Sequence, residues 1–351
     1  MHFGMISICD NDPAKRPNEQ FYRELLDQIV LAEELGYDDY WIAEHHYSDY
    51  GVVPSPAMLL AAAATRTSRI GLGSGVSILP FHDPMRVAEE YAMVDLLSNG
   101  RLTFGVGRGF LIHEFEGFGI RDDADSRERF DEALEVILTA WKGERFSFHG
   151  KHFHVDDLKL NVLPVQQPRP PVFMAALSPS SYEKAANAGI PVAGVIATLK
   201  TLDRVEERVA TFKKLYAQAG HDADTVDVPM TWYAFAVQDR SRVHEDGGRH
   251  LIDYFRSIGK VFDPAKVSDP QVRKVYEELH EWNHNVTWDH IENNTDVALI
   301  GDPEQLIGQI ERARDAGVNK VQLFMNFGNR PHEEVAASMR LFAEEVIPHF
   351  R

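Results

Sequence analysis

Apolar positions along the chain follow two spacings, one typical of buried strands and one typical of helices. Short runs rich in β-branched and aromatic residues predict strands at residues 2–8, 39–43, 69–79, 102–106, 171–176, 191–196, 228–237 and 320–324. Helical spacing predicts helices between them, as at 19–35, where Gly36 suits a left-handed C-cap. Sustained strand–helix alternation predicts a parallel sheet covered by helices.

Eight strands, each followed by a helix, predict a single-domain α/β fold, a (β/α)8 TIM barrel over residues 1–351. Two stretches interrupt the alternation. Residues 142–170 include aromatic residues alternating with polar ones, which predicts a small hairpin. Residues 259–300 include 262–294, which has no clean period, and we predict a mobile lid there because insertions of this length are usually lids or disordered.

Composition narrows the classes of function. The 351 residues are 44% apolar, and 36 Lys and Arg against 54 Asp and Glu give a net charge of −18. Such a chain repels nucleic acid and anionic membranes, so an anionic ligand needs a local site. Cys9 is the only cysteine, which excludes an intrachain disulfide and a cysteine metal cluster. No apolar run reaches the roughly 18 residues of a membrane span, and we expect a cytoplasmic protein.

Polar residues and glycines follow four consecutive predicted strands, where a barrel carries its functional groups. They are Glu44, His45 and His46 after the second strand, Ser74, Gly75 and Val76 in the third, Gly107 and Arg108 after the fourth, and Leu177, Ser178 and Ser181 after the fifth. Their repeated placement predicts one shared cleft. For the histidines alone, a strand-to-loop exit with surface side chains is the alternative.

Arg108 stands between two glycines, so it can present a guanidinium and backbone N–H groups together. Ser178 and its neighbours open a predicted helix, whose positive end also attracts anions. Both features suit a phosphate monoester. The alternatives are an N-capping role for the serines and a surface salt bridge for Arg108.

The sequence resembles the bacterial luciferase-like flavin monooxygenases over nearly its whole length. The resemblance lies in Glu44-His45-His46, in Gly73-Ser74-Gly75, in residues 100–109 (GRLTFGVGRG) and in residues 337–342 (ASMRLF). It implies a TIM barrel that binds reduced FMN (FMNH2) supplied by a separate flavin reductase. In this family O2 adds to flavin C4a, and the resulting peroxyflavin oxidises a substrate.

The resemblance also implies roles for single residues. His45 matches the catalytic histidine of the family, and His46 matches the residue next to it. Gly75-Val76 matches a non-prolyl cis peptide under the flavin ring. Arg108, Ser178 and Ser181 match residues that contact the phosphate or the ribityl chain, and Phe262 matches a residue of the lid. Three residues depart from luciferase, which has a cysteine, a glutamate and a tryptophan at the positions of Gly107, Leu177 and Ile196. These departures argue against light emission and an aldehyde substrate.

A neutral imidazole at His45 can accept a proton from a substrate or stabilise an oxygenated flavin by hydrogen bonding, and Glu44 can orient one imidazole or pair with an arginine. Candidate pocket residues suggest a small, partly hydrophobic substrate; they are Ile6, Leu111, Ile196 and Phe262. The alanine run 61–64 and the habit of the family predict a homodimer.

Three alternatives stay open. An F420-dependent oxidoreductase can use the same barrel and phosphate region, and a catalytically idle protein can simply bind flavin. A zinc hydrolase is the third, because His280 and His284 fit the H-E-x-x-H pattern and His290 has the spacing of a third ligand. Thr287 stands where that protease class needs glycine, and we expect no metal.

Overall fold

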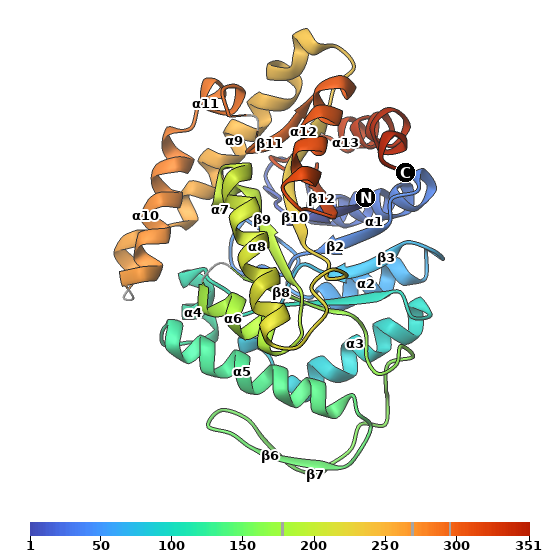
Figure 1. The fold of residues 1–351 in the computed structure, drawn as a ribbon, viewed down its shortest axis with the longest axis vertical. Coiled ribbons are helices and arrows are strands. Elements are labelled where there is room, and N and C mark those ends of the chain that lie inside the picture. The colour runs from blue at the N-terminus through green and yellow to red at the C-terminus, as the bar shows by residue number, and fades with distance from the viewer. Residues whose placement is uncertain (177–178, 268–269, 295) are drawn as a thin grey trace.

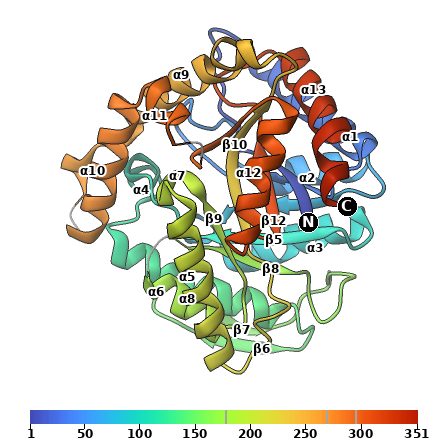
Figure 2. The same ribbon diagram turned by 45° about the horizontal axis from the view of Figure 1, so that its top comes forward.

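A ring of parallel strands forms the core of the fold, and helices surround it (Figures 1 and 2). The computed structural model describes residues 1–176, 179–267, 270–294 and 296–351. Its parallel strands are β1 (His2–Ser7), β2 (Asp39–Ile42), β3 (Gly71–Ser74), β4 (Ser77–Ile78), β5 (Leu102–Gly107), β8 (Val172–Ala175), β9 (Val192–Val195), β10 (Pro229–Ala236), β11 (Ala298–Gly301) and β12 (Lys320–Phe324). Pairing runs from β12 through β1, β2, β3, β5, β8 and β9 to β10, which returns to β12. The predicted single-domain eight-stranded barrel is confirmed.

The surrounding helices lie between the strands, as predicted, and the helix predicted at 19–35 begins one residue earlier. They are α1 (Asn18–Leu35), α2 (Pro56–Ala64), α3 (Pro84–Ser98), α5 (Asp123–Ala140), α6 (Pro179–Asn187), α8 (Leu202–Gln218), α12 (Pro303–Asp315) and α13 (His332–Leu341). Gly36 ends α1 with a φ of 79°, the left-handed cap that its lack of a Cβ allows. Asp83 caps α3 by accepting two backbone N–H groups, and Pro84 supplies the first helical residue.

The strand predicted at 69–79 is two strands. β3 pairs with β2 on one side and β5 on the other, whereas β4 continues only along β5, with Ser77 opposite Val106. Between them the peptide bond from Gly75 to Val76 is cis. The backbone therefore changes direction at the end of the third barrel strand, where the sequence pattern predicted uninterrupted pairing.

Strand β11 was not predicted. Thr231 in β10 pairs with Gln322 of β12 on one edge and with Val195 of β9 on the other. Two residues later, Tyr233 still pairs with β12 on the first edge. On the other edge, where β9 no longer pairs with β10, Tyr233 pairs with Ala298 of β11. β11 thus extends the barrel wall beyond the end of β9. Its four residues are all buried and too few to show a period.

The segment 262–294 contains helices, so the prediction of an irregular stretch there is wrong. α9 (Arg249–Ile258) leads into it, and α10 (Pro270–Asn285) and α11 (Trp288–Glu292) lie within it. The stripe of α10 facing the protein includes Tyr276, Leu279 and Asn283. This stripe is narrow and one of its buried positions is polar, so no apolar period shows in the sequence. The other excursion is the predicted hairpin, β6 (Phe146–His149) and β7 (His154–Leu158), which lies away from the barrel in Figure 1.

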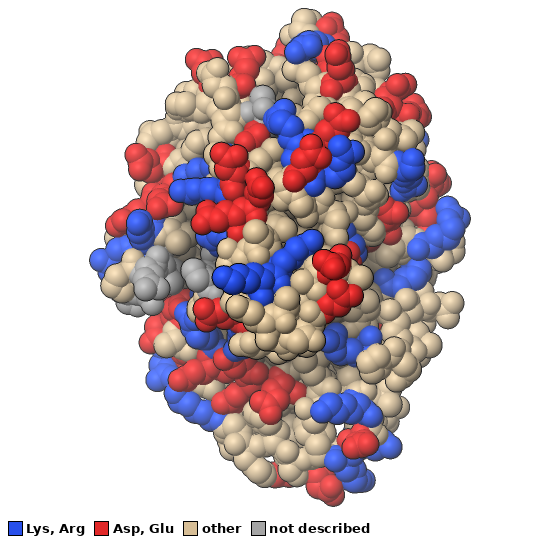
Figure 3. Space-filling view, viewed as in Figure 1, with Lys and Arg blue, Asp and Glu red and all other residues tan. Residues whose placement is uncertain are grey.

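Two apolar clusters hold the fold together. The larger packs the outer faces of the strands against the helices, as with Met5 and Ile29. The second joins side chains inside the barrel, such as Trp41 and Phe173, to α9, α10 and α11. None of the described helices is long and apolar enough to cross a membrane. On the face in Figure 3, basic and acidic side chains are interspersed.

Candidate active site

The motif after β2 turns inward. Glu44, His45 and His46 are at most 8% exposed, so the alternative of surface histidines is wrong. The chain returns along the motif, where His45 N donates to the carbonyl of Val53 at 3.2 Å. Gly51 makes this return possible, because a Cβ there would lie 2.6 Å from the Cβ of His45. The two imidazoles are therefore fixed by packing against their own loop.

Glu44 orients His46, as one of the two predicted roles requires. Its Oε1 lies 3.0 Å from His46 Nε2 and 2.6 Å from His82 Nε2, and its Oε2 accepts from the N–H of Ile78 at 3.0 Å. Burial raises the pKa of Glu44, but these three donors outweigh it and hold the pKa below its usual value. Burial lowers the pKa of His82, and the bond to Glu44 raises it by more. Glu44 is therefore a buried carboxylate with a lowered pKa, hydrogen-bonded to a His82 imidazole with a raised pKa.

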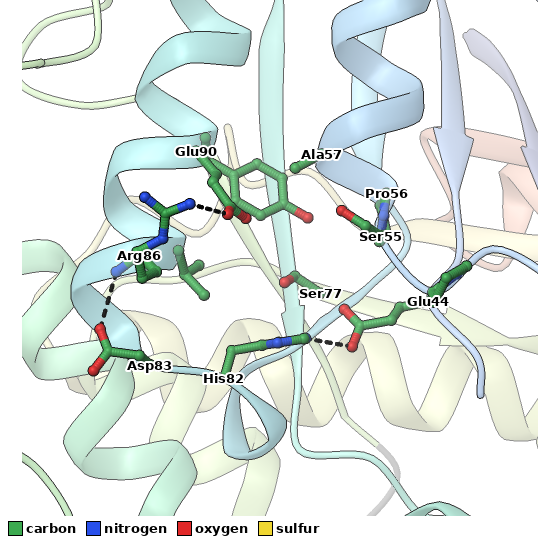
Figure 4. Close-up of a pocket in the computed structure, with 12 residues that line it drawn as sticks. Glu44, Ser55, Pro56, Ala57, Ser77, His82, Asp83, Arg86 and Glu90 are labelled. Carbon is green, nitrogen blue, oxygen red and sulfur yellow. Dashed lines mark hydrogen bonds and ion pairs between the residues drawn. The ribbon is translucent and has the colours of Figure 1, made fainter. Parts of the chain in front are cut away.

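A cavity of about 130 Å³ lies on the other side of this pair, between the starts of α2 and α3. Figure 4 shows Glu44 and His82 pointing toward one another at its edge. Ser55, Ser77 and Tyr91 also line it, and neither His45 nor His46 does. The cavity is therefore separate from the barrel mouth, and Glu44 is the residue that touches both.

His45 has a different carboxylate. Its Nδ1 lies 3.0 Å from Oε1 of Glu114, and the same oxygen accepts from the N–H of His46 at 2.9 Å. Glu114 is fully buried on α4 (Ile112–Phe118), a helix that the sequence pattern did not predict. The sequence signal for Glu114 is an acidic residue inside the mostly apolar run 110–115. That signal does not indicate that His45 is its partner.

The ends of β1, β3 and β5 pack closely beneath the motif. A Cβ on Gly107 would lie 2.6 Å from Val76 Cγ2, and one on Gly75 would lie 3.0 Å from Ile6 Cδ1. Ser74 is fully buried, and its hydroxyl donates to the carbonyl of Gly105 at 2.8 Å. The glycine backbone at these strand ends therefore lies directly against the side chains of Ile6, Trp41 and Val76. The cis peptide that the resemblance implies is present here.

Two arginines converge on the first turn of α5. Arg108 pairs with Asp123 through Oδ1, and Arg127 contacts the second oxygen of Asp123 at 2.9 Å. Arg127 also donates to Ser180 Oγ at 3.2 Å, which places its guanidinium group at the N-terminus of α6. Arg108 thus forms the salt bridge of the alternative interpretation, and its role in phosphate binding stays a prediction. The sequence pattern missed Arg127, since nothing in it places α5 beside α6.

The remaining predicted cofactor and pocket residues divide into groups. Ser181 is half-buried in the first turn of α6, and Leu177 and Ser178 lie outside the described residues. Ile6, Leu111 and Phe262 belong to the second apolar cluster. Ile196 belongs to the main core instead, so the structure does not bring it together with the other three.

The excursion that carries Phe262 packs onto the loop after β5. Phe262 stacks on Phe110 with ring centroids 5.8 Å apart, and the Tyr276 hydroxyl donates to the carbonyl of Phe110. His280 Nδ1 lies 2.7 Å from the carbonyl of Phe262. α10 and its preceding loop are therefore joined to the loop after β5, the loop that carries Arg108.

The histidines of the H-E-x-x-H pattern bond to their own segment. The Nδ1 of His280 donates to Phe262, and the Nδ1 of His284 donates to the carbonyl of His280 at 2.9 Å. His290 bonds to the N–H of Thr287 at 3.1 Å. Among the described residues, the groups that could hold a metal are Glu44 with His46 and His82, and Asp125 with Glu128 and His152.

Neither of those groups favours a cation. In the first, the 2.6 Å contact between Glu44 and His82 is a hydrogen bond, and it is shorter than the spacing of two ligands around a metal. In the second, Asp125 is already paired with Arg121 and Arg129. The site chemistry is therefore that of imidazoles, carboxylates and guanidinium groups.

Comparison with known proteins identifies the family. Residues 1–320 match the model of luciferase-like monooxygenases. The chain belongs to this family. Among luciferase-like relatives it is 29% identical over 327 residues to limonene 1,2-monooxygenase of Rhodococcus erythropolis, covering 93% of this chain and 80% of the relative. It is 24% identical over 352 residues to the oxygenase component of the flavin-dependent trigonelline monooxygenase of Acinetobacter baylyi, covering 100% and 96%.

Solved luciferase-like structures share the whole architecture. Monooxygenase RslO1 from Streptomyces bottropensis matches with a TM-score of 0.85 and 28% identity over 100% of both chains. The oxygenating constituent of 3,6-diketocamphane monooxygenase from Pseudomonas putida, in complex with FMN, gives 0.80 and 22% over 99% and 98%. An F420-dependent secondary alcohol dehydrogenase gives 0.77 and 21% over 100% and 99%. The last two show the fold alone.

Proposed function

We propose that this luciferase-like monooxygenase is the oxygenase component of a two-component system. It takes FMNH2 from a separate flavin reductase and uses O2 to oxidise a small, partly hydrophobic organic substrate. The balance is simple: FMNH2 supplies two electrons and two protons, one oxygen atom enters the substrate, and the other leaves as water. The observation that carries the proposal is the placement of His45, the Gly75-Val76 backbone and Arg108 at neighbouring strand ends.

The described residues fit FMN. The guanidinium groups of Arg108 and Arg127 share the carboxylate of Asp123, and Arg127 also reaches the N-terminus of α6; together they offer more donors than that one carboxylate uses. This set suits a phosphate dianion. The backbone packs at Gly75 against the apolar side chains of Ile6 and Trp41 and at Gly107 against Val76, and a ring system can lie on this apolar surface. When bound, the reduced flavin would supply the electrons that activate O2.

The chain's own residues then bind, orient and exclude water. The lone pair of His45 Nε2 can accept a proton from a group in the cleft, because its Nδ1 is engaged by Glu114. Aromatic side chains around the barrel mouth, including Phe110, Tyr233 and Phe262, offer apolar contacts to a substrate. Their packing is the support for a partly hydrophobic substrate.

Two relatives support the cofactor and the reductase. The trigonelline enzyme is named as an oxygenase component, which indicates a division of labour with a separate partner. The 3,6-diketocamphane enzyme was solved with FMN. F420-dependent enzymes share the barrel, so the identity of the deazaflavin or flavin has to come from binding.

We also propose a homodimer through α2 and α3. These neighbouring helices expose Met58, Met93, Leu96 and Leu97, each at least 49% accessible, next to the alanine run of α2. Burying such a surface between two copies is favourable. Analytical sedimentation of the wild-type protein should give the mass of a dimer, and Met93→Glu should give monomers. Met85→Glu is not a suitable control, because Met85 packs on the core. Leu158→Glu on the distant hairpin is the matched control.

An anaerobic titration tests the cofactor assignment. FMNH2, reduced riboflavin and reduced F420 are each titrated into the full chain and into Arg127→Ala. We expect FMNH2 to bind tightest, and we expect the variant to lose roughly 10-fold in affinity for FMNH2 but little for riboflavin, since a charge-assisted bond contributes about 1.5–3 kcal/mol. Preference for reduced F420 would overturn the assignment. Flavin binding without oxygenated product, with any reductase, would indicate a catalytically idle protein.

A further inference from the structure

Glu114 reaches the candidate active site from an element that carries no other predicted site residue. Its side chain is 1% exposed, and one oxygen, Oε1, accepts from both His45 Nδ1 and the N–H of His46. The other oxygen, Oε2, is buried and has no hydrogen-bond partner among the residues that the structure describes. A buried unpaired oxygen costs on the order of 1–3 kcal/mol, so the carboxylate is kept against a cost.

The local fold does not require that charge. The N–H of His46 needs one acceptor, which a neutral amide at position 114 would also provide. What only a carboxylate adds is a negative charge and the inability to donate a hydrogen bond. Both act on the imidazole of His45, whose Nδ1 lies 3.0 Å from Oε1.

The ring of His45 is also restricted on its other sides. Tyr50 packs edge-on with ring centroids 4.5 Å apart, and Gly51 lies so close that a Cβ there would be 2.9 Å from His45 Cδ2. Within the described residues, Nε2 makes no hydrogen bond, and this nitrogen is not completely shielded from solvent. One ring nitrogen, Nδ1, is thus hydrogen-bonded to Glu114, and the other, Nε2, can bond to a group outside the ring's own surroundings.

We propose that Glu114 is the positioning residue that sets the tautomer of His45 for proton transfer; the inference rests on the proposed function. Because a carboxylate only accepts, Nδ1 carries the hydrogen and Nε2 keeps its lone pair. A donor X–H in the cleft gives its proton to Nε2, the N–H bond forms, and the electron pair of the X–H bond stays on X. Glu114 balances the imidazolium until Nε2 returns the proton to a leaving oxygen.

The first test needs no flavin. Nitrogen NMR of the cofactor-free protein, with His45→Ala to assign the signals, should show His45 protonated at Nδ1 and unprotonated at Nε2. In Glu114→Gln the amide can donate as well as accept, so the two tautomers should become mixed. Glu114→Asp keeps the charge and should keep the Nδ1–H tautomer. A wild-type Nε2–H tautomer, or an unchanged tautomer in Glu114→Gln, would overturn the proposal.

The second test is a double-mutant cycle on product formation. Glu114→Gln should lower kcat about 10²-fold, the size of a typical general acid–base contribution, with KM little changed. Glu116→Gln, an exposed acid on the same helix, is the control. In the His45→Ala background Glu114→Gln should cause no further loss, because it acts through His45. If the losses of kcat in the two single variants multiply in the double variant, Glu114 acts independently of His45 and has a structural role.

The two tests fail separately. If no substrate is oxidised, the proposed function fails while the tautomer measurement still decides the role of Glu114. Thermal unfolding and FMNH2 affinity of each variant are measured in parallel, and both should match the wild-type protein in Glu114→Gln. A loss of flavin binding in this variant would overturn the assignment of Glu114 to proton transfer.

Discussion

Nε2 of His82 lies 2.6 Å from Oε1 of Glu44, although 38 residues separate them in the chain. His82 follows the short turn after β4, and Glu44 follows β2, so this bond ties the ends of neighbouring barrel strands together. The same Glu44 oxygen also contacts His46. The position of the loop that carries His45 and His46 therefore depends on the contact between Glu44 and His82, which borders the cavity between α2 and α3.

This pair predicts a window of pH. Glu44 has a lowered pKa, so its contribution to stability is present above its usual 4.5 and is lost as pH falls through the folded value. His82 has a raised pKa, so its contribution is full below 6.5 and is lost as pH rises through the folded value. Glu44→Gln should lower the free energy of unfolding by up to roughly 3 kcal/mol within that window.

Urea unfolding at pH 5.5 and pH 8.5 measures this effect. The loss caused by Glu44→Gln should be larger at pH 5.5, and Glu135→Gln, an exposed acid on α5, should change neither value. Equal losses at both pH values would show that His82 does not hold the proton that the ion pair requires.

His45→Ala should separate binding from chemistry. Reduced-flavin affinity should stay within a few-fold of the wild type, since the anion site at Arg108 is untouched. Substrate oxidation should fall by roughly 10²-fold or more with the loss of proton transfer. Rapid mixing of the reduced complex with O2, followed by product and hydrogen peroxide analysis, measures both. Unchanged product yield per flavin would remove His45 from the mechanism.

Asp10 predicts a second pH effect, of opposite origin. It is fully buried, and burial raises its pKa to about 7, although the N–H groups of Gly328 and Asn329 bond to it. The folded protein therefore holds a proton that the unfolded chain has lost, and stability falls as pH rises from about 4 to about 7.

Asp10→Asn should remove that dependence. Between pH 6 and pH 8 the wild-type contribution falls by about 1 kcal/mol, as one pKa unit corresponds to about 1.4 kcal/mol. The variant keeps an acceptor for Gly328 and should show a correspondingly flatter profile in urea unfolding. Asp49→Asn, an exposed neighbour of the same loop region, is the control, and its profile should follow the wild type.

Tyr276 joins α10 to the barrel through the carbonyl of Phe110. Tyr276→Phe removes the hydroxyl and should weaken this attachment by about 1 kcal/mol, the net value of a hydrogen bond. Hydrogen exchange in residues 270–285 should speed up several-fold, with little change in the barrel strands. Tyr47→Phe, at a side chain that is 65% exposed, should leave exchange in α10 unaltered. Unchanged exchange in Tyr276→Phe would show that stacking with Phe262 alone holds the helix.

Most of the barrel was predictable because its strands and helices carry strong periods. The strand of residues 2–8 and the helix of 19–35 end within about two residues of the predicted bounds, as is usual for such elements. Local chemistry was readable too: Gly36 caps α1, and the motif at Glu44 ends a buried strand. These features depend on near neighbours in sequence.

Features that depend on distant contacts were not predictable. β11 is a strand because it pairs with the free edge of β10, which lies far away in sequence. α10 packs on the protein through a stripe of side chains that includes the polar residue Asn283. Glu114 and Arg127 meet their partners only because α4 and α5 fold back over the strand ends. Ile196 was assigned to the substrate pocket by position, but its side chain turns into the main core.

The pairing of β11 with β10 means that the excursion of residues 238–297 starts and finishes on one strand. Ala236 and Gly301 lie opposite each other, and the N–H of Val237 donates to the carbonyl of Gly301 at 3.0 Å. An insert whose two ends lie side by side on one strand can change length at little entropic cost. The hydrogen bonds that would have to be replaced include those that join Tyr276 to Phe110 and Asp296 to Trp232. We expect relatives of this chain to exchange substrate range by swapping this insert, while the catalytic strand ends are inherited unchanged.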